Sequence, residues 1–440
     1  MHKKRKLAAR FCTVLLSFLC IILSALPALA ATPTPPAITD GRAVILYDKT
    51  HGKFMAEQNA DSRVNTSTSA KIMTGLIACE KLSARLDDAI TVTEEMLDSA
   101  SGYSMKLKAG ERITVRDLLY GAICGSYNDA AYVLASVIGG DSNGFVAMMN
   151  EYAVTLGAKN TSYTNPLGYP DNTAMVTTAH DTLKIALAAS ENELYMEICS
   201  ALKHTVPATN KSEERQFYNR NFLISSASDP KYYNAGCRGM NAGYSGEAGG
   251  WSVVTLAQDD GADYICVLLG GTSTEDDSRI YAYETVNKLI KWVSRTYNNY
   301  TVFPAGAQLG TTSIGLTSIA TPDAPYVIAE DLVVYIPTES GEVTYSIDLQ
   351  KDLKAPLHAG DEIGRVTVSS SGEVVGTAPL ILKEDYEVNA VMLVIDKIGA
   401  YTKSRAFIAT ILCFIILTVA VIAYKRLTRY SSRGRYTRRT

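Results

Sequence analysis

The feature that most limits how this chain can fold is an uncharged stretch of nineteen residues near its C-terminus, residues 406–424. A helix of that length crosses a bilayer. Seven basic residues follow it within 425–440, and the positive-inside rule predicts that they form a cytoplasmic tail. The folded part of the chain is therefore expected before residue 406, with 387–405 as a juxtamembrane segment that could be amphipathic.

The N-terminus has the pattern of a targeting segment. Residues 1–30 begin with a basic cluster, continue through an apolar stretch at 11–26 and end in Ala28-Leu29-Ala30, a small-x-small cleavage pattern. We expect a signal peptide over 1–30 and a Pro/Thr-rich leader linker over 31–41. Both ends together predict a single-pass cell-membrane protein with an extracytoplasmic ectodomain.

The body between these ends is acidic. Of the 42 basic residues in the chain, five lie in the signal segment and seven in the tail, which leaves 30 against all 45 acidic residues. This negative excess argues against a nucleic-acid partner for the body. Five of the eight cysteines lie in the body, and most are flanked by apolar or small residues. We interpret them as free core thiols rather than a disulfide framework, and we expect neither a metal site nor a cofactor.

The patterning of the body indicates two domains. Residues 42–299 have strand patterns near both ends and helical patterns between them. They predict an α/β (α+β) domain whose sheet is assembled from distant segments, with helices packed against it. Residues 300–386 alternate apolar and polar positions between Gly, Ser and Asp turns, which predicts a small all-β domain.

A hydroxyl-rich run at 65–69 passes at Lys71 into an apolar-periodic segment, which predicts a buried helix from about residue 72 to 86. At about 100° per residue, Thr68 and Ser67 both lie within about 60° of Lys71 around the helix axis. A hydroxyl beside a lysine is a candidate activated nucleophile. The alternative is an N-cap cluster with a solvated lysine.

Two further polar clusters follow along the chain. Ser126 and Asn128 lie in a short break between two predicted helices, a pattern that by itself indicates helix capping. Asn241-Ala242-Gly243 precede a predicted strand pair near Trp251. A Gly-x-Ser-x-Gly pattern at 140–144 also matches a nucleophile elbow, but the preceding segment predicts a helix rather than the strand that an elbow requires. We interpret it as a turn.

The order of the three clusters resembles the D-alanyl-D-alanine carboxypeptidases, the low-molecular-mass penicillin-binding proteins of the transpeptidase/β-lactamase-like superfamily. That family carries Ser-x-x-Lys, Ser-x-Asn and Lys-Thr-Gly in this order. The sequence resembles this family over about residues 42–271, most clearly in the segments 43–58, 71–74, 107–128, 160–167 and 177–181. The resemblance implies a peptidase domain at 42–299, with an antiparallel sheet flanked by helices on both faces. It also implies peptidoglycan stem peptides as substrates, β-lactams as ligands, and a role in cell wall biogenesis and cell shape.

The resemblance also implies roles for individual residues. Thr68 stands at the nucleophile position, Lys71 at the position of the base, and Ser126 at that of the proton relay. Asn128 would orient the peptide. The substrate carboxylate would be bound by the third cluster, Asn241, Ala242 and Gly243.

Two of the three motifs depart from the family pattern. Thr68 replaces a serine and adds a methyl that restricts rotation about χ1, and Ser67 is the alternative nucleophile. Asn241 and Ala242 replace lysine and threonine, so a charge and a hydroxyl are missing where a charge-assisted hydrogen bond would be about twice as strong as a neutral one. Arg238 could replace the charge, although an exposed turn arginine is the alternative.

These departures leave two expectations open. The first is a serine-type D-Ala-D-Ala carboxypeptidase of impaired activity, which removes the terminal D-Ala through an acyl-enzyme. The second is a catalytically inactive paralogue that binds peptidoglycan or another cell-wall enzyme.

Overall fold

The computed structural model describes residues 33–433 apart from 99, 170–173, 227–228, 260, 275–278, 318–322 and 340–342. The expected signal peptide and the last residues of the basic tail lie outside the described residues. The chain divides into two compact units. One runs to Asn299 and includes Pro337–Glu339, and the other begins at Tyr300 and contains the remaining residues up to the C-terminal helix.

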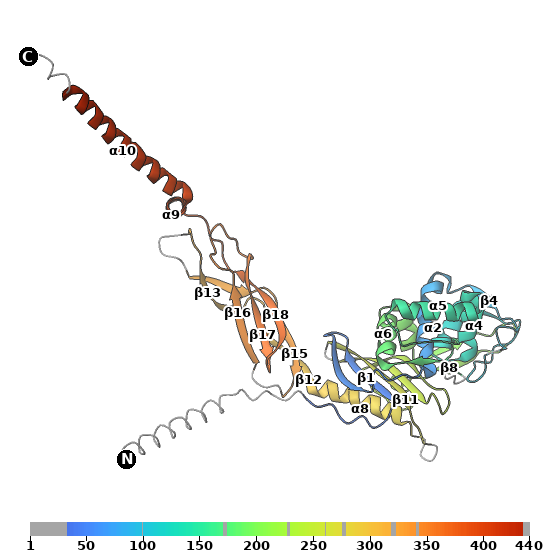
Figure 1. Ribbon diagram of the computed structural model, residues 1–440. Helices are drawn as coiled ribbons and strands as arrows, with labels where there is room; N and C mark the ends of the chain where they lie inside the picture. Colours follow the sequence, from blue (N-terminus) through green and yellow to red (C-terminus); the bar gives the residue numbers. More distant parts are fainter. Residues whose placement is uncertain are drawn as a thin grey trace, which may run out of the picture. The chain divides into compact units, whose positions relative to one another are not determined.

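The first unit is built on a five-stranded sheet in the order β2-β1-β11-β10-β9, in which all neighbouring strands are antiparallel (Figure 1). Strand β1 pairs with β11 more than 200 residues later, for example Val44 with Leu268. The prediction of a sheet assembled from distant segments is therefore confirmed. The strands are β1 (Ala43–Asp48), β2 (Lys53–Gln58), β9 (Cys237–Tyr244), β10 (Trp251–Asp259) and β11 (Ala262–Gly271).

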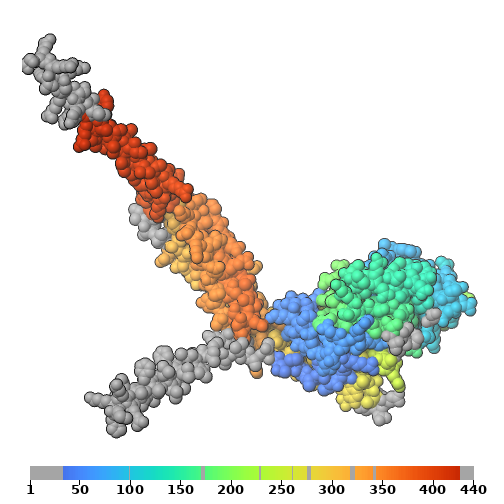
Figure 2. Space-filling view, viewed as in Figure 1, coloured from blue at the N-terminus to red at the C-terminus, as the bar shows by residue number. Residues whose placement is uncertain are grey.

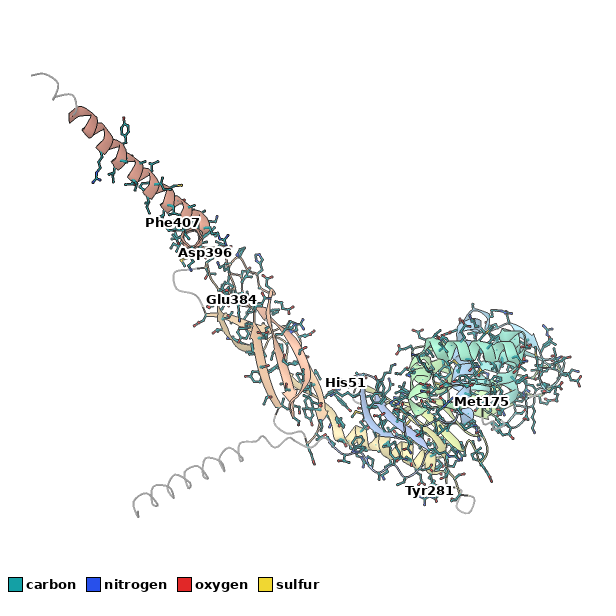
Figure 3. The ribbon with its side chains drawn as sticks, viewed as in Figure 1. His51, Met175, Tyr281, Glu384, Asp396 and Phe407 are labelled. Carbon is teal, nitrogen blue, oxygen red and sulfur yellow. The ribbon has the colours of Figure 1, made fainter. Side chains whose placement is uncertain are left out.

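Helices cover both faces of this sheet, because its central strands are apolar at nearly every position. Val254 and Leu256 of β10 pack into the large core beneath α2 (Ala70–Leu82), whereas α8 (Tyr281–Thr296) contacts β10 and β11 from the opposite side. In Figure 1, α8 lies on one side of the sheet, and the helices between residues 70 and 190 lie on the other. Figure 3 places His51 in the turn between β1 and β2 and Tyr281 at the start of α8.

The helical layer surrounds α2, which is buried along almost its whole length. Figure 2 shows the later part of this layer as a green surface beside the blue surface of the N-terminal strands. They are α2 (Ala70–Leu82), α3 (Val115–Ile123), α4 (Asn128–Gly139), α5 (Ser142–Thr155), α6 (Ala179–Ser190) and α7 (Glu193–Ser200). Three two-stranded ribbons complete the unit: β3 (Val64–Asn65) with β6 (Val176–Thr177), β4 (Ala89–Thr91) with β5 (Arg112–Thr114), and β7 (Lys203–Val206) with β8 (Arg215–Tyr218).

Several local expectations are met and others need correction. The helix predicted to extend to residue 86 ends at Leu82, where a short 3-10 turn, η2 (Ser83–Arg85), replaces it. The 140–144 pattern follows helix α4 directly: Gly140 is the C-cap of α4, Asp141 caps α5 by accepting a hydrogen bond from the Gly144 amide, and residues 142–144 form the first turn of α5. The turn interpretation therefore holds for residues 140 and 141, and a helix rather than a strand directly precedes the pattern. The five cysteines of the body are free and buried. The short strands and α7 were not predicted, since they contain too few residues to show a period.

The second unit is all-β until its final helices, as predicted. Its main sheet has the order β13-β14-β18-β17-β16, and β12 pairs with β15. The strands are β12 (Tyr297–Phe303), β13 (Gln308–Ser313), β14 (Asp323–Ile328), β15 (Leu332–Pro337), β16 (Val343–Leu349), β17 (Glu362–Ser370) and β18 (Glu373–Leu382). Helices α9 (Ala390–Thr402) and α10 (Arg405–Arg433) follow. Within the described residues, Arg405–Arg426 is long and apolar enough to cross a membrane, with a mean hydropathy of 2.9.

Candidate active site

The hydroxyl-rich run forms a short 3-10 helix, η1 (Ser67–Ser69), that continues directly into α2. This continuity places Thr68 one turn before Lys71, and both side chains are almost completely buried. Ser67 adopts a left-handed backbone conformation with φ +50°, which is uncommon for a residue other than glycine. Backbone strain of this kind clusters at functional sites.

The hydroxyl of Ser67 is directed away from Lys71. It donates a hydrogen bond of 3.0 Å to the carbonyl of Gly250 and accepts one of 2.9 Å from Ser245. Ser67 does not contribute to the lining of the cavity into which Lys71 opens. The structure therefore separates the two hydroxyls that the sequence left as alternatives, and Thr68 is the one in the cavity.

Thr68 lies against the edge strand β9 and is held by the neighbouring strand β10. Its Oγ1 is 2.8 Å from Oγ of Ser252, a fully buried residue. A Cβ built on Gly243 would lie 2.9 Å from Thr68 Oγ1 and 3.0 Å from its methyl, so a larger residue at this point of β9 would displace the Thr68 side chain. Within the described part of the chain, no hydrogen bond joins Thr68 to Lys71.

Lys71 has the properties of a base. Burial, together with the smaller effect of the positive charge of Arg220, lowers the pKa of its amine to about 7. An amine with a pKa near neutrality is largely available as a proton acceptor at physiological pH. Perturbed titration inside a cavity is a feature of functional sites.

Ser126 and Asn128 enter the cavity from the break between α3 and α4. Ser126 has φ +55°, the second left-handed residue of the site, and its hydroxyl has no partner among the described residues. Asn128 donates a 2.7 Å hydrogen bond to the Ser101 carbonyl, and its own side-chain oxygen is buried without a described partner. Since buried polar atoms are normally paired, this oxygen is an acceptor that a ligand N–H could satisfy.

The third cluster lies on β9, but its members differ in placement. Ala242 and Gly243 line the cavity, whereas Asn241 is buried outside the lining with an unpaired side-chain oxygen. Arg238 is also outside the cavity and hydrogen-bonds Gln258 and the carbonyls of Ala235 and Cys237.

The cavity that unites these groups has a volume of about 200 Å³. The residues in its lining are Thr68, Lys71, Gly102, Tyr103, Ser126, Asn128, Tyr169, Arg220, Ala242, Gly243 and Tyr244. It brings together residues of all three sequence clusters, which are up to 175 positions apart between Thr68 and Gly243. This convergence is the geometric basis for treating the cavity as the functional site.

Arg220 is the main residue that sequence reasoning missed. Its guanidinium lies 4.5 Å from the ring centre of Tyr103, which stacks on Tyr127. The buried asparagines Asn219 and Asn221 fix the backbone on both sides of it through hydrogen bonds to Ala201 and Gly239 carbonyls. The sequence signal that could have identified Arg220 was its position between two asparagines, in a segment that has neither helical nor strand periodicity. No sequence signal marked Ser252 as a site residue, because it lies within an ordinary strand pattern.

Comparison with known proteins extends over both units. Residues 30–273 match the profile of the D-alanyl-D-alanine carboxypeptidase family, and residues 297–388 match the profile of the penicillin-binding protein 5 C-terminal domain. The chain is 30% identical to the D-alanyl-D-alanine carboxypeptidase DacC of Escherichia coli K12 over 387 residues, which cover 83% of this chain and 90% of the relative.

Two more comparisons agree with this result. The D-alanyl-D-alanine carboxypeptidase DacF of Bacillus subtilis is 26% identical over 79% of this chain and 86% of its own. The crystal structure of penicillin binding protein 5 from Haemophilus influenzae aligns with a TM-score of 0.56 at 25% identity, covering 81% of this chain and 99% of that one. On the strength of its two profile matches, these relatives and the three converging motifs, the chain belongs to the D-alanyl-D-alanine carboxypeptidase family of low-molecular-mass penicillin-binding proteins.

Proposed function

We propose that this protein is a D-Ala-D-Ala carboxypeptidase of reduced activity that acts on peptidoglycan stem peptides, with Thr68 as its nucleophile. The observation that carries the proposal is the buried Lys71 amine, whose pKa of about 7 equips it as a base in the cavity that Thr68 also lines. A silent site would not require a neutral amine beside a buried hydroxyl. The family membership supplies the substrate class.

The reaction proceeds through an acyl-enzyme. Thr68 Oγ1 attacks the carbonyl of the penultimate D-Ala, and the neutral Lys71 amine takes its proton. Ser126 relays that proton to the leaving amine, so the peptide C–N bond breaks and terminal D-Ala departs. Water then hydrolyses the ester and regenerates the Thr68 hydroxyl. The unpaired oxygen of Asn128 accepts a hydrogen bond from a peptide N–H of the substrate and holds it in place.

The substrate carboxylate needs a cation that the third motif does not supply. Arg220 lines the same cavity, and its stacking on Tyr103 fixes its guanidinium. An arginine binds a carboxylate through two parallel hydrogen bonds. We assign carboxylate binding to Arg220. Ala242 and Gly243, which have small side chains, let the substrate approach the backbone of β9 closely.

We keep the domain limits as part of the proposal: a signal peptide over 1–30, a leader over 31–41, a peptidase domain over 42–299, a β domain over 300–386, and a juxtamembrane segment over 387–405. The apolar helix then anchors the protein through residues 406–424. The peptidase domain lies outside the cytoplasm, and the tail 425–440 lies inside.

A second candidate function is a catalytically inactive binding module. The 2.8 Å contact between Thr68 and Ser252 favours it, because the hydroxyl is bound to β10 rather than to Lys71. Asn241 and Ala242 likewise bring no charge to β9. Such a protein would keep the cavity for peptidoglycan or another cell-wall enzyme without turning over a peptide.

Intact-mass analysis of the full-length protein after incubation with benzylpenicillin separates the two functions. The enzyme should form a stoichiometric adduct at Thr68, which disappears in Lys71→Ala and persists in the matched variant Ser67→Ala. Absence of an adduct at high β-lactam concentration, with unchanged thermal unfolding, would refute the enzymatic proposal. An adduct at Ser67 would refute the assignment of Thr68.

A further inference from the structure

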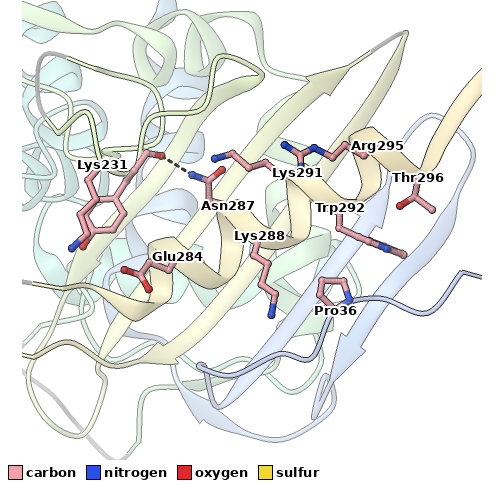
Figure 4. Close-up of a pocket in the computed structure, with 10 residues that line it drawn as sticks. Pro36, Lys231, Glu284, Asn287, Lys288, Lys291, Trp292, Arg295 and Thr296 are labelled. Carbon is pink, nitrogen blue, oxygen red and sulfur yellow. Dashed lines mark hydrogen bonds between the residues drawn. The ribbon is translucent and has the colours of Figure 1, made fainter.

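A basic cavity lies along α8, on the face of the sheet opposite to α2. Its volume is about 510 Å³, and four cations line it: Lys231, Lys288, Lys291 and Arg295. A smaller cavity of about 220 Å³ adjoins it and shares Lys291 and Arg295. Figure 4 shows Lys291 and Arg295 on one side of α8 and Lys288 directed to the other side, toward Pro36.

These four cations have no carboxylate partner within the described residues. Glu284 also lines the larger cavity, but it forms an ion pair of 2.6 Å with Arg279. Asp259 lines the smaller cavity. The concentration of positive charge contrasts with the acidic body, in which 45 acidic residues face 30 basic ones after the five basic residues of 1–30 and the seven of 425–440 are set aside from the 42.

Helix formation alone does not explain the cluster. Lys288, Lys291 and Arg295 are spaced by three and four residues, so like charges are neighbours on the helix surface and weaken the helix. The partial negative charge at the helix C-terminus favours Arg295 in the last turn. That effect falls off within one turn, so it does not account for Lys288.

Hydrogen bonds hold two of the segments that line the larger cavity. Asn287 donates a hydrogen bond to the Tyr232 carbonyl and accepts one from Asn234, which holds the 231–234 segment against α8. On the other side, Lys288 donates a 3.3 Å hydrogen bond to the carbonyl of Ala37 in the leader. The four cations are themselves exposed, and the volume of the cavity is within the range of ligand-binding pockets.

The cavity also has an aromatic wall. Trp292 is half-buried, and Pro36 of the leader lies beside it in Figure 4. The indole N–H has no hydrogen-bond partner among the described residues. An amphipathic ring of this kind packs against the carbon skeleton of a ligand while donating to one of its oxygens.

We propose that this face of α8 binds a linear phosphodiester polymer built on polyol units. Lys291 and Arg295 hold phosphates at the boundary between the two cavities, and Trp292 packs on the intervening polyol carbons. Lysines act as point charges toward phosphate, and arginine adds a bidentate contact. Two adjoining cavities on shared cations suit a chain with repeated charges better than a single anion. The site is separate from the Thr68 cavity, so it tethers the protein rather than reacting with the polymer.

The test measures binding of a fluorescent synthetic poly(glycerol phosphate) to the full-length protein in zwitterionic detergent, as a function of salt. We expect Lys291→Gln/Arg295→Gln to weaken binding about tenfold or more at low salt and to reduce the slope of log K against log salt by about two. The charge-matched control Lys53→Gln/Lys203→Gln alters two exposed lysines away from both cavities. It should change affinity less than about twofold.

Three outcomes would overturn the proposal. The first is an equal loss in the control variant, which would show that net charge alone drives binding. The second is equal binding of a poly-glutamate of matched length, which would remove the phosphodiester assignment. The third is binding only to vesicles that contain an anionic phospholipid, which would make the ligand a membrane surface. Trp292→Phe keeps an aromatic ring and should retain most of the affinity, whereas Trp292→Ala should lose it at unchanged thermal stability.

Discussion

Replacing Thr68 by serine is the change that tests most directly how this site differs from its family. In the structure the Thr68 hydroxyl is 2.8 Å from Ser252, and its methyl faces Gly243 at a point where even an added Cβ would be 3.0 Å away. To reach Lys71 the hydroxyl must leave Ser252 by rotation about χ1, and the methyl must then occupy another staggered position. Serine removes that second requirement.

The two restraints on the hydroxyl differ in size. The Ser252 hydrogen bond contributes about 1 kcal/mol net and reduces the population of the reactive rotamer about fivefold, and Thr68→Ser keeps this hydrogen bond. Displacement of an attacking atom by about 1 Å costs roughly a hundredfold in rate. We therefore expect Thr68→Ser to acylate with benzylpenicillin about ten to a hundred times faster than the wild type. Loss of the buried methyl should lower the free energy of unfolding by about 1 kcal/mol.

The assay is time-resolved intact-mass analysis of the acyl-enzyme, with thermal unfolding measured on the same samples. Ser252→Ala removes the competing hydrogen bond but keeps the methyl, so it should give an intermediate gain of about fivefold. Thr68→Ser that acylates no faster than the wild type, with its fold intact, would show that the Thr68 methyl does not restrain the nucleophile. The impairment would then have to reside in the Ser252 hydrogen bond or in β9.

Three further predictions concern the rest of the cavity. Acylation should increase as the pH rises through about 7, because only the neutral Lys71 amine accepts a proton. Arg220→Gln removes a charge that lowers the pKa of Lys71, so the midpoint of the pH–rate profile should move to higher pH. Arg238→Gln, which lies outside the cavity, should leave the midpoint unchanged. Asn241→Lys/Ala242→Thr restores the family residues on β9 and should lower KM for a D-Ala-D-Ala peptide about tenfold, as steady-state kinetics would show, since the variant adds a hydroxyl to the cavity lining and a second cation on β9; an unchanged KM would leave carboxylate binding to Arg220 alone. Gly243→Ala places a Cβ 2.9 Å from Thr68 Oγ1, so it should abolish the penicillin adduct and lower the unfolding temperature, and an adduct of wild-type yield would contradict the close packing of β9 on Thr68.

The sequence by itself determined much of this protein because its strongest signals are local. Charge-free and basic runs identified the candidate membrane helix, and the period of apolar residues located α2 to α6 and the β-rich second unit. The three short motifs identified the family through their order. The helix geometry of residues 68–71 was also predictable, since a spacing of three residues fixes one turn.

Only the tertiary structure decided which groups face one another. Strand β9 has few residues with β propensity, and its place at the sheet edge depends on pairing with β10, which brings Gly243 against Thr68 across 175 positions. Three further placements depend on segments without helical or strand periodicity in the sequence. They are the hydrogen bond of Ser67 to the Gly250 carbonyl, the contact of Thr68 with Ser252, and the position of Arg220 in the cavity. The pKa of Lys71 follows from burial under these segments, because desolvation is a property of the assembled core and not of the residues next to it in the chain.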